Sequence, residues 1–375
     1  MRIVFITHYD NMYGANMALK ELLIRIKAEG THEAILVLPA DGMFAETMRS
    51  AGIEVYVCGV TQWQAIWREP VSFAVKSAKR RKAMDAEVTM LYEHFKDRGI
   101  DAVHSNSSVI GTGAMLAEKL GCRHFWHIRE FAHEHYGCEY FYPEETVKRY
   151  YESADCLIAI SDAIKDYMRE KYPSANVVRI YDGIEKAEKP ERPLREVRNF
   201  IYISYLFPAK QQLELLKAAA ELKKKGYKDF RIIFAGGGDK AYEKKLKAYA
   251  AKHGLKEAEF MGYVNDIPAL LTECDAGIMI SDHEGFGLAT VEYMRAGLPV
   301  IGYTSGATPE IVRDSETGLL CTDLKELSDK MDMLMKDKEL AHSMGDAGYE
   351  RAMKCFTSEI NVSAVLELYR SIGGR

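Results

Sequence analysis

The most constraining feature of the sequence is a regular alternation of short apolar segments with longer amphipathic ones, interrupted once near the middle. The first series starts at Arg2–Thr7 and ends near Ile180, and the second starts at Phe200–Ser204 and runs to about Ile372. Short apolar runs bounded by polar turns are typical of strands buried on both faces, and a three- to four-residue repeat is typical of helices. Alternating strands and helices predict parallel sheets with right-handed crossovers.

The interruption, Glu185–Arg198, reads EKAEKPERPLREVR. Two prolines, many charges and no apolar periodicity are expected of a linker. A chain of 375 residues is also too long for one ordinary core. We therefore expect an α/β fold with two Rossmann-like, doubly wound domains facing across a cleft that holds the ligand. The expected parts are residues 1–184, a linker at 185–198, residues 199–355, and a C-terminal helix at 356–375 packing back on the first domain.

Composition excludes several classes of protein. A net charge of −5 argues against a general nucleic-acid binder. No apolar run approaches the roughly 18 residues needed to span a bilayer. The first residues, MRIVFITHYD, are typical of a buried strand and not of a signal peptide. Seven scattered cysteines without a CxxC pair indicate reduced thiols, so we expect a cytoplasmic protein. The eleven histidines show no ligand spacing, and we expect no metal site.

The segment Ser281–Pro299, SDHEGFGLATVEYMRAGLP, has the clearest functional pattern. It follows an expected buried strand at Ala276–Ile280 and leads through a Gly-Phe-Gly turn into an expected helix at Leu288–Arg295, which Gly297 and Pro299 end. A strand, a glycine turn and a helix together present free backbone N–H groups to an anion.

Two glutamates, Glu284 and Glu292, bracket this turn and helix. Eight helical residues rise about 12 Å, so the two carboxylates would reach separate parts of one extended ligand. A nucleotide sugar fits, with one glutamate on the sugar, one on the ribose and the diphosphate on the turn amides. Spacing alone leaves a second interpretation open, in which Glu284 caps the helix and Glu292 is a solvated helix residue. The amides belong to Gly285, Phe286, Gly287 and Leu288.

The run EGFGLATVEYMRAGLPVIG, followed by GATPEIV and TGLL, resembles the signature of retaining glycosyltransferases of family 4, which have the GT-B fold. Glu284 and Glu292 match the two glutamates of that signature. Gly236-Gly237-Gly238 resembles the glycine loop of the family's second domain, and Gly262-Tyr263-Val264 the segment that borders the base. Asp182-Gly183-Ile184 stands where the family usually has Asn-Gly-Ile. The resemblance covers most of the chain.

One position departs from the family pattern in a way that bears on catalysis. The family commonly grips the diphosphate with an arginine and a lysine, and here Lys210 matches the lysine whereas Tyr205 replaces the arginine. Tyrosine donates one hydrogen bond but brings no charge. Lys210 then carries more of the leaving-group stabilisation, unless Arg129 or another cation compensates.

In the first domain, which binds the acceptor in this family, three positions resemble family features. Gly14 resembles the glycine whose backbone approaches the donor phosphate and the acceptor, and an ordinary turn glycine is the alternative. His127, in FWHIRE, resembles the histidine near the reacting centre, and a structural strand-end histidine is the alternative. Asn106 follows a short expected strand and either caps a helix or touches the acceptor. Arg129 is grouped with these acceptor-binding residues.

A segment at residues 63–82 mixes aromatic and basic side chains, as interfacial helices do. Because bacterial relatives often act on lipid-linked acceptors, one interpretation is peripheral contact with the anionic inner face of the plasma membrane. A solvated basic helix face is the alternative. The side chains concerned are Trp63, Trp67, Phe73, Lys76, Lys79, Arg80, Arg81 and Lys82.

The resemblance implies a retaining transfer of a hexose-type sugar from a UDP- or GDP-sugar to a glycan or lipid-linked acceptor in cell-surface polysaccharide synthesis, with no metal or other cofactor. The alternative is a catalytically weak or silent nucleotide-sugar-binding subunit of a partner transferase, prompted by Tyr205. An NAD-dependent oxidoreductase is disfavoured, because no GxGxxG follows the first strand. The implied catalytic residues are Glu284, His127 and Lys210. The implied donor-binding residues are Gly14, Tyr205, Lys210, Gly236, Tyr263, Val264, Glu284, Gly285, Phe286, Gly287, Leu288 and Glu292.

Overall fold

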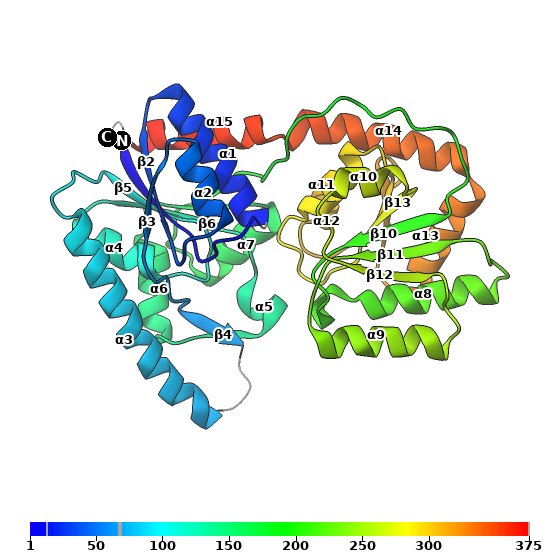
Figure 1. Ribbon diagram of the computed structural model, residues 1–375, viewed down its shortest axis with the longest axis horizontal. Helices are drawn as coiled ribbons and strands as arrows, with labels where there is room; N and C mark the ends of the chain where they lie inside the picture. The colour runs from blue at the N-terminus through cyan, green and yellow to red at the C-terminus, as the bar shows by residue number, and fades with distance from the viewer. Residues whose placement is uncertain (13, 67–69, 374–375) are drawn as a thin grey trace. The chain divides into compact units, whose positions relative to one another are not determined.

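The computed structural model of the protein describes residues 1–12, 14–66 and 70–373, and these fall into two compact units (Figure 1). The first unit comprises Met1–Asp182 together with Ser358–Arg375, and the second comprises Gly183–Thr357. The C-terminal helix therefore belongs to the unit that begins the chain.

Within the described residues, the first unit is built on a seven-stranded sheet whose neighbouring strands are all parallel. From one edge to the other the strands are β3 (Glu54–Val57), β2 (Glu33–Leu38), β1 (Arg2–Ile6), β5 (Ala102–Ser105), β6 (Arg123–Ile128), β8 (Cys156–Ala159) and β9 (Val177–Arg179). Most of their side chains are fully buried on both faces, which explains the continuous apolar runs of the sequence.

Helices cover both faces of this sheet. One face packs on α1 (Gly14–Glu29), α2 (Met43–Ser50) and α15 (Ser358–Gly373). The other face packs on α3 (Pro70–Phe95) and α4 (Thr112–Leu120). The remaining long helices of the unit are α6 (Glu144–Ser153) and α7 (Asp162–Lys171). Because α15 contributes Val365, Leu366 and Tyr369 to the core, the last helix of the chain is part of the first hydrophobic core.

The His-, Tyr- and Glu-rich segment after β6 contains regular structure. A short helix, α5 (Ala132–Tyr136), precedes β7 (Cys138–Tyr140), which pairs antiparallel with β4 (Gln64–Ile66). Strands of three residues are too short for a readable alternation, and their partners lie far apart in sequence. The sequence therefore could not reveal this ribbon.

The second unit contains a six-stranded sheet in its described residues, again with all neighbours parallel. The strand order is β12 (Ala258–Gly262), β11 (Arg231–Ala235), β10 (Asn199–Ile203), β13 (Ala276–Met279), β14 (Val300–Tyr303) and β15 (Gly318–Cys321). The strand β15 and the one-turn helix α12 (Thr308–Ile311) lie in a stretch for which the sequence suggested no element.

Helices also flank both faces of the second sheet. Figure 1 shows α8 and α9 on one side and α10 and α11 on the other. Besides α12, the helices and the 3₁₀ turn of this unit are η1 (Pro208–Lys210), α8 (Gln212–Lys224), α9 (Lys240–Lys252), α10 (Ile267–Thr272), α11 (Leu288–Arg295), α13 (Leu324–Lys336) and α14 (Lys338–Cys355). Both described sheets are thus doubly wound.

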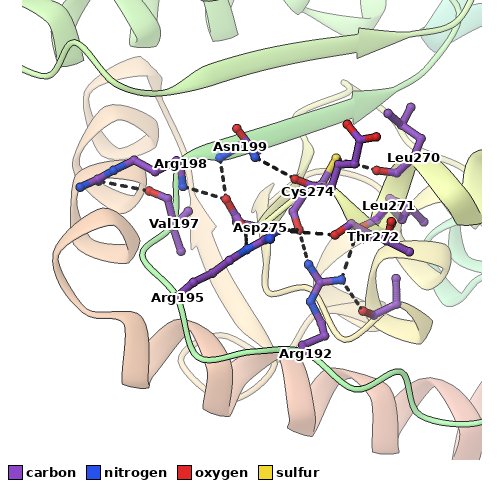
Figure 2. Close-up of polar contacts among 12 residues, drawn as sticks. Arg192, Arg195, Val197, Arg198, Asn199, Leu270, Leu271, Thr272, Cys274 and Asp275 are labelled. Carbon is purple, nitrogen blue, oxygen red and sulfur yellow. Dashed lines mark hydrogen bonds and ion pairs between the residues drawn. The ribbon is translucent and has the colours of Figure 1, made fainter.

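The segment Glu185–Arg198, here called the strap, has neither helix nor strand but is fixed to the second unit by its arginines (Figure 2). Arg192 donates to the carbonyl oxygens of Ala296 (3.0 Å) and Leu271 (3.3 Å) and also to that of Cys274. These carbonyls lie at helix ends, where backbone oxygens lack intrahelical partners.

Asp275 anchors the far end of the strap. Its Oδ1 accepts from Arg195 Nε across 2.5 Å, and its Oδ2 accepts the backbone N–H groups of Arg198 (2.9 Å) and Asn199 (2.8 Å) (Figure 2). Asp275 is buried, so these three donors replace the water that the carboxylate loses on folding. The strap therefore leads directly into β10, the central strand of the second sheet.

Each sheet has one point at which the chain reverses its direction of winding. In the first unit this point lies between β1 and β5, and in the second between β10 and β13. Ligands of open α/β sheets bind outside the carboxyl ends of the strands at such a point. The loops after these four strands are therefore where a site is expected.

Candidate active site

Two of the proposed site residues meet at the switch point of the second sheet. Lys210 ends η1 in the loop after β10, and Glu284 lies in the loop after β13. Lys210 Nζ donates to Glu284 Oε2 across 2.9 Å, and the two side chains are only 13% and 14% exposed. An ammonium and a carboxylate are thus held together, largely out of water, where a sheet of this topology binds its ligand.

Backbone contacts fix both loops. The Asp282 N–H donates to the Ala209 carbonyl across 3.2 Å, and the Tyr202 hydroxyl donates to the Lys210 carbonyl across 2.6 Å. The Ala307 N–H donates to the Glu284 carbonyl across 2.8 Å. These bonds set the backbone on both sides of the ion pair, so its geometry does not depend on the two flexible side chains alone.

Gly306 lets the loop after β14 approach Glu284. Its φ is +55°, and a Cβ at this position would lie 2.3 Å from the Glu284 carbonyl oxygen and 2.5 Å from its nitrogen. Both the positive φ and the close approach require glycine. The backbone of Glu284 is therefore held from behind by a position that tolerates no side chain.

The Gly-Phe-Gly turn leads into the start of α11. Gly287 is the N-cap residue, with φ at +84°, and has no side chain with which to cap the helix. The Glu284 carboxylate lies in the same turn and forms an ion pair with Lys210. The Phe286 side chain is buried against Phe356, so only its backbone can serve a ligand. The turn Gly285–Leu288 thus presents backbone groups at a positive helix end.

Glu292 lies one turn from the end of α11 and is partly buried. Burial raises the pKa of its carboxyl group, and the nearby Arg295 partly offsets the rise. Among the described residues we find no hydrogen-bond or ion-pair partner for this carboxylate. A desolvated carboxylate without a protein donor is a suitable acceptor for ligand hydroxyl groups.

The glycine loop after β11 is clamped between its neighbours. A Cβ on Gly236 would lie 2.1 Å from the Ser204 carbonyl oxygen, and the Gly236 N–H donates to the Gly262 carbonyl across 2.7 Å. Tyr205 directly follows Ser204, and Tyr263 directly follows Gly262. The two tyrosine side chains are 61% and 65% exposed. Both tyrosines therefore stand at the carboxyl edge of the sheet, and Val264 beside them is partly buried.

In the first unit, Asn106 and Arg129 are brought together at the carboxyl ends of β5 and β6. Arg129 donates to Asn106 Oδ1 from Nε (3.3 Å) and from Nη2 (3.1 Å) and forms an ion pair with Asp182. Asn106 Nδ2 in turn donates to the Ala15 carbonyl across 3.1 Å, which links this group to the loop after β1. Arg129 is thus paired with a carboxylate of its own unit.

His127 lies in β6 with its neighbour His104 in β5, and both are buried. The two rings share a hydrogen bond of 2.7 Å between His104 Nε2 and His127 Nδ1, and the Tyr369 hydroxyl bonds to His104 Nδ1. Burial, together with the charge of Arg129, holds the pKa of both histidines well below the usual range, so both rings are neutral. Sequence reasoning missed His104 and Tyr369, which no local pattern joins.

Gly14 is the first residue of α1, and Asn16 orders the loop before it. Asn16 Nδ2 donates to the carbonyls of Tyr9 (3.0 Å) and Asn11 (2.7 Å), and its Oδ1 accepts from Thr7 across 2.6 Å. Burial lowers the pKa of the neighbouring His8 to about 4. The expected glycine thus sits at a helix start beside a switch-point loop.

Trp63, the first aromatic residue of the 63–82 segment, is not a surface feature. Trp63 is fully buried, donates to the Ser108 carbonyl across 2.8 Å and contacts Trp126. Phe73 packs on Phe141. Trp67 lies outside the described residues. The interpretation of this segment as an exposed aromatic-and-basic surface is therefore wrong for Trp63, because this side chain completes an aromatic core beneath the β4–β7 ribbon.

The described residues contain no group of three or more His, Cys, Asp or Glu side chains placed to hold a metal ion. Over the same residues, no helix combines the length and the apolar character required to cross a membrane. All seven cysteines are free thiols.

Two family profiles match adjoining parts of the sequence. The profile described as glycosyl transferases group 1 matches residues 184–351, and that described as glycosyltransferase family 4 matches residues 42–188. The chain belongs to glycosyltransferase family 4. It is accordingly a glycosyltransferase of enzyme class EC 2.4, and the family expectation from the sequence is confirmed.

Known proteins extend this likeness over most of the chain. A glycosyltransferase of Bacillus subtilis (strain 168), EpsD, is 29% identical over 323 residues, which span 77% of this chain and 82% of that protein. Anabaena Alr3699/HepE in complex with UDP and glucose matches with a TM-score of 0.81 at 20% identity, over 99% of this chain and all of that one.

Sucrose-phosphate synthase of Thermosynechococcus elongatus gives a TM-score of 0.79 at 19% identity, over the whole of this chain and 99% of that one. At such identities these likenesses concern the fold. This family 4 glycosyltransferase has the GT-B fold, as expected from the sequence.

Proposed function

We propose that this protein is a retaining glycosyltransferase that moves a hexose-type sugar from a nucleotide sugar to a glycan or lipid-linked acceptor in cell-surface polysaccharide synthesis. The observation that carries the proposal is the Lys210–Glu284 pair, 2.9 Å apart at the switch point of the second sheet. A sugar diphosphate needs a cation and N–H donors for its phosphates and an acceptor for its sugar hydroxyls. The two loops supply all three.

The proposed binding mode follows from the geometry of this unit. The diphosphate lies on the amides of Gly285–Leu288, with Lys210 as its cation, while Glu284 turns from the ion pair to accept sugar hydroxyls. Glu292, whose burial raises its pKa, accepts the ribose hydroxyls. In this arrangement the lysine stabilises charge that develops on the leaving diphosphate, which is where a positioned charge accelerates transfer.

Retention is proposed to follow from attack of the acceptor hydroxyl on the same face from which the diphosphate leaves. The departing phosphate oxygen then takes the proton of the acceptor, so the chain needs no general base for this step. Positioning and charge stabilisation carry the catalysis. Because Lys210 provides the positive charge, we expect turnover to persist in EDTA, and its loss on chelation followed by recovery with a divalent ion would contradict this expectation.

Donor identity is tested by calorimetry or thermal shift with UDP-, GDP- and ADP-sugars. UDP-sugars are the first to test, because the Anabaena neighbour has been crystallised with UDP and with UDP-glucose. The best donor is then titrated into Glu284→Ala and Glu292→Ala. Unchanged donor affinity in both variants would refute the proposed site.

The basic part of α3 supports a proposed contact with an anionic membrane surface. Lys76, Lys79, Arg80 and Lys82 are exposed on this helix. Co-sedimentation with vesicles containing phosphatidylglycerol should fall on replacing these four residues by glutamine and should fall with added salt. Equal binding by the variant would leave the helix as a solvated basic face.

A second candidate function is a catalytically silent donor-binding subunit. It is favoured by Tyr205, which is neutral and 61% exposed where the family commonly has an arginine. The two functions make opposite predictions for the purified chain. Donor hydrolysis or sugar transfer by the chain alone, abolished in Glu284→Ala, would exclude the silent subunit.

A further inference from the structure

A line of polar side chains crosses one face of the first sheet. His104 on β5 lies beside Phe5 in register, and Tyr369 of α15 reaches this face from the helix that covers it. The Tyr369 hydroxyl bonds to His104 Nδ1, and His104 Nε2 lies 2.7 Å from His127 Nδ1. All three side chains are at most 2% exposed. In the sequence, 265 positions separate His104 from Tyr369.

Counting protons along this line fixes its direction. The Tyr369 hydroxyl is buried and has no second polar partner among the described residues, so as an acceptor it would leave its own proton unpaired. An unpaired buried donor is costly, and the hydroxyl therefore donates to His104 Nδ1. A neutral imidazole carries one proton. His104 then carries it on Nε2 and donates to His127 Nδ1, and His127 carries its proton on Nε2.

The far end of the line is left with a donor. His127 Nε2 is buried and makes no hydrogen bond to any described side chain or backbone group. In this tautomer it is an N–H without an acceptor among the described residues. The chain thus orders a hydrogen-bond donor that its own groups do not use.

We propose that Tyr369, acting through His104, is a positioning residue that holds His127 as the Nε2–H tautomer, so that His127 donates a hydrogen bond to an acceptor oxygen of a bound saccharide and takes no proton from it. The identity of the saccharide oxygen rests on the proposed function, whereas the tautomer does not. The role extends the active site to the last helix of the chain, which no motif of the family signature includes.

The tautomer is measured directly on the full chain labelled with ¹⁵N-histidine on a deuterated background. Two-bond ¹H–¹⁵N correlations separate protonated from unprotonated ring nitrogens, and the His127 signals are those missing from His127→Gln. We expect a protonated Nε2 and an unprotonated Nδ1 in the wild type. A protonated Nδ1 on His127 would overturn the proposal whether or not any variant folds.

Tyr369→Phe removes the donating hydroxyl and keeps the ring that packs on Phe125. We expect the second His127 tautomer to appear and kcat/KM to fall by roughly two- to twelve-fold, the effect of one neutral hydrogen bond. Tyr151→Phe is the matched control, because it also removes a buried tyrosine hydroxyl of this unit, one that bonds to Tyr140 and the Ser108 carbonyl. It should leave the His127 signals in place.

The outcomes separate the two proposals. Unchanged His127 signals in Tyr369→Phe would refute the proposal that Tyr369 sets the His127 tautomer through His104. The same change of the His127 signals in Tyr151→Phe would also refute it. If His127 has the expected tautomer but the chain turns over no nucleotide sugar, the proposed function would be refuted. The positioning role of Tyr369 would still hold.

Discussion

Replacing Lys210 with methionine removes the ammonium group that lies 2.9 Å from Glu284 and keeps most of the side-chain volume. In the proposed reaction this group stabilises the leaving diphosphate, and no arginine assists it at position 205. A hydrogen bond to a charged group contributes about 1.5–3 kcal/mol. A full charge at about 4 Å contributes about 4 kcal/mol at an effective dielectric constant of 20, so we expect kcat/KM to fall between about 10- and 1,000-fold.

Lys210→Met also affects the stability of the fold, and the experiment must separate this effect from the effect on catalysis. Methionine at position 210 removes the cation that pairs with the Glu284 carboxylate, which is only 14% exposed. Removing one partner of a largely buried ion pair destabilises the fold. The double variant Lys210→Met/Glu284→Gln removes both charges and should recover thermal stability relative to Lys210→Met without recovering activity.

Lys210→Arg is the matched control, because it retains the charge but changes the position of the donors. We expect it to keep more activity than Lys210→Met and to fall short of the wild type. The assay is release of the nucleoside diphosphate with the donor found in the binding screen, at saturating and limiting concentrations, alongside thermal unfolding of each variant. A folded Lys210→Met chain within threefold of wild-type kcat/KM would refute the assignment of leaving-group stabilisation to this lysine.

Three further predictions concern the second unit. Glu292→Gln should raise the melting temperature at pH 8, because burial raises the folded-state pKa of this carboxyl group and its charge therefore destabilises the folded protein. This destabilisation is full above the folded-state pKa, shrinks as the pH falls toward the unfolded value of 4.5 and is absent below it. A wild type that is more stable than Glu292→Gln at pH 8 would contradict this reasoning. Gly306→Ala should lower the free energy of unfolding by at least about 2 kcal/mol and should lower donor affinity. Gly254→Ala is the control: its φ is also positive, but nothing lies within 4 Å of the added Cβ, so it should lose only the backbone strain of about 1–2 kcal/mol. Equal unfolding free energies for the two variants would show that the contact with Glu284 is unimportant. Asp275→Asn should lower the free energy of unfolding in urea by about 1–3 kcal/mol and speed tryptic cleavage of the strap, because an amide cannot accept all three N–H donors. Unchanged cleavage would show that other contacts hold the strap.

The elements that the sequence predicted well are those with clear signals at their ends. The helix α11 begins and ends at the expected residues, Leu288 and Arg295. A glycine turn precedes this helix, and Gly297 and Pro299 end it. The strand β13 was also expected, whereas β15 was not.

The candidate site was predictable as residues but not as contacts. The spacing of Glu284 and Glu292 and the family signature pointed to both glutamates and to Lys210, yet no pattern showed that Lys210 and Glu284 pair. Similarly, Asp182 was noted as a departure from the family, whereas its ion pair with Arg129 comes from the meeting of β6 with the end of the first series. Contacts between distant segments depend on the fold, and a single sequence does not contain them explicitly.

The position of α15 has a consequence for how the protein is made. The core of the first unit includes Val365, Leu366 and Tyr369, so that core stays incomplete until α15 has been synthesised and has left the ribosome. The second unit is one continuous stretch, Gly183–Thr357, and meets no such delay. Domains usually mature from the N-terminus during translation. In this protein the unit synthesised first completes its folding last. Until then, the apolar face of the sheet that α15 covers is exposed to chaperones and proteases.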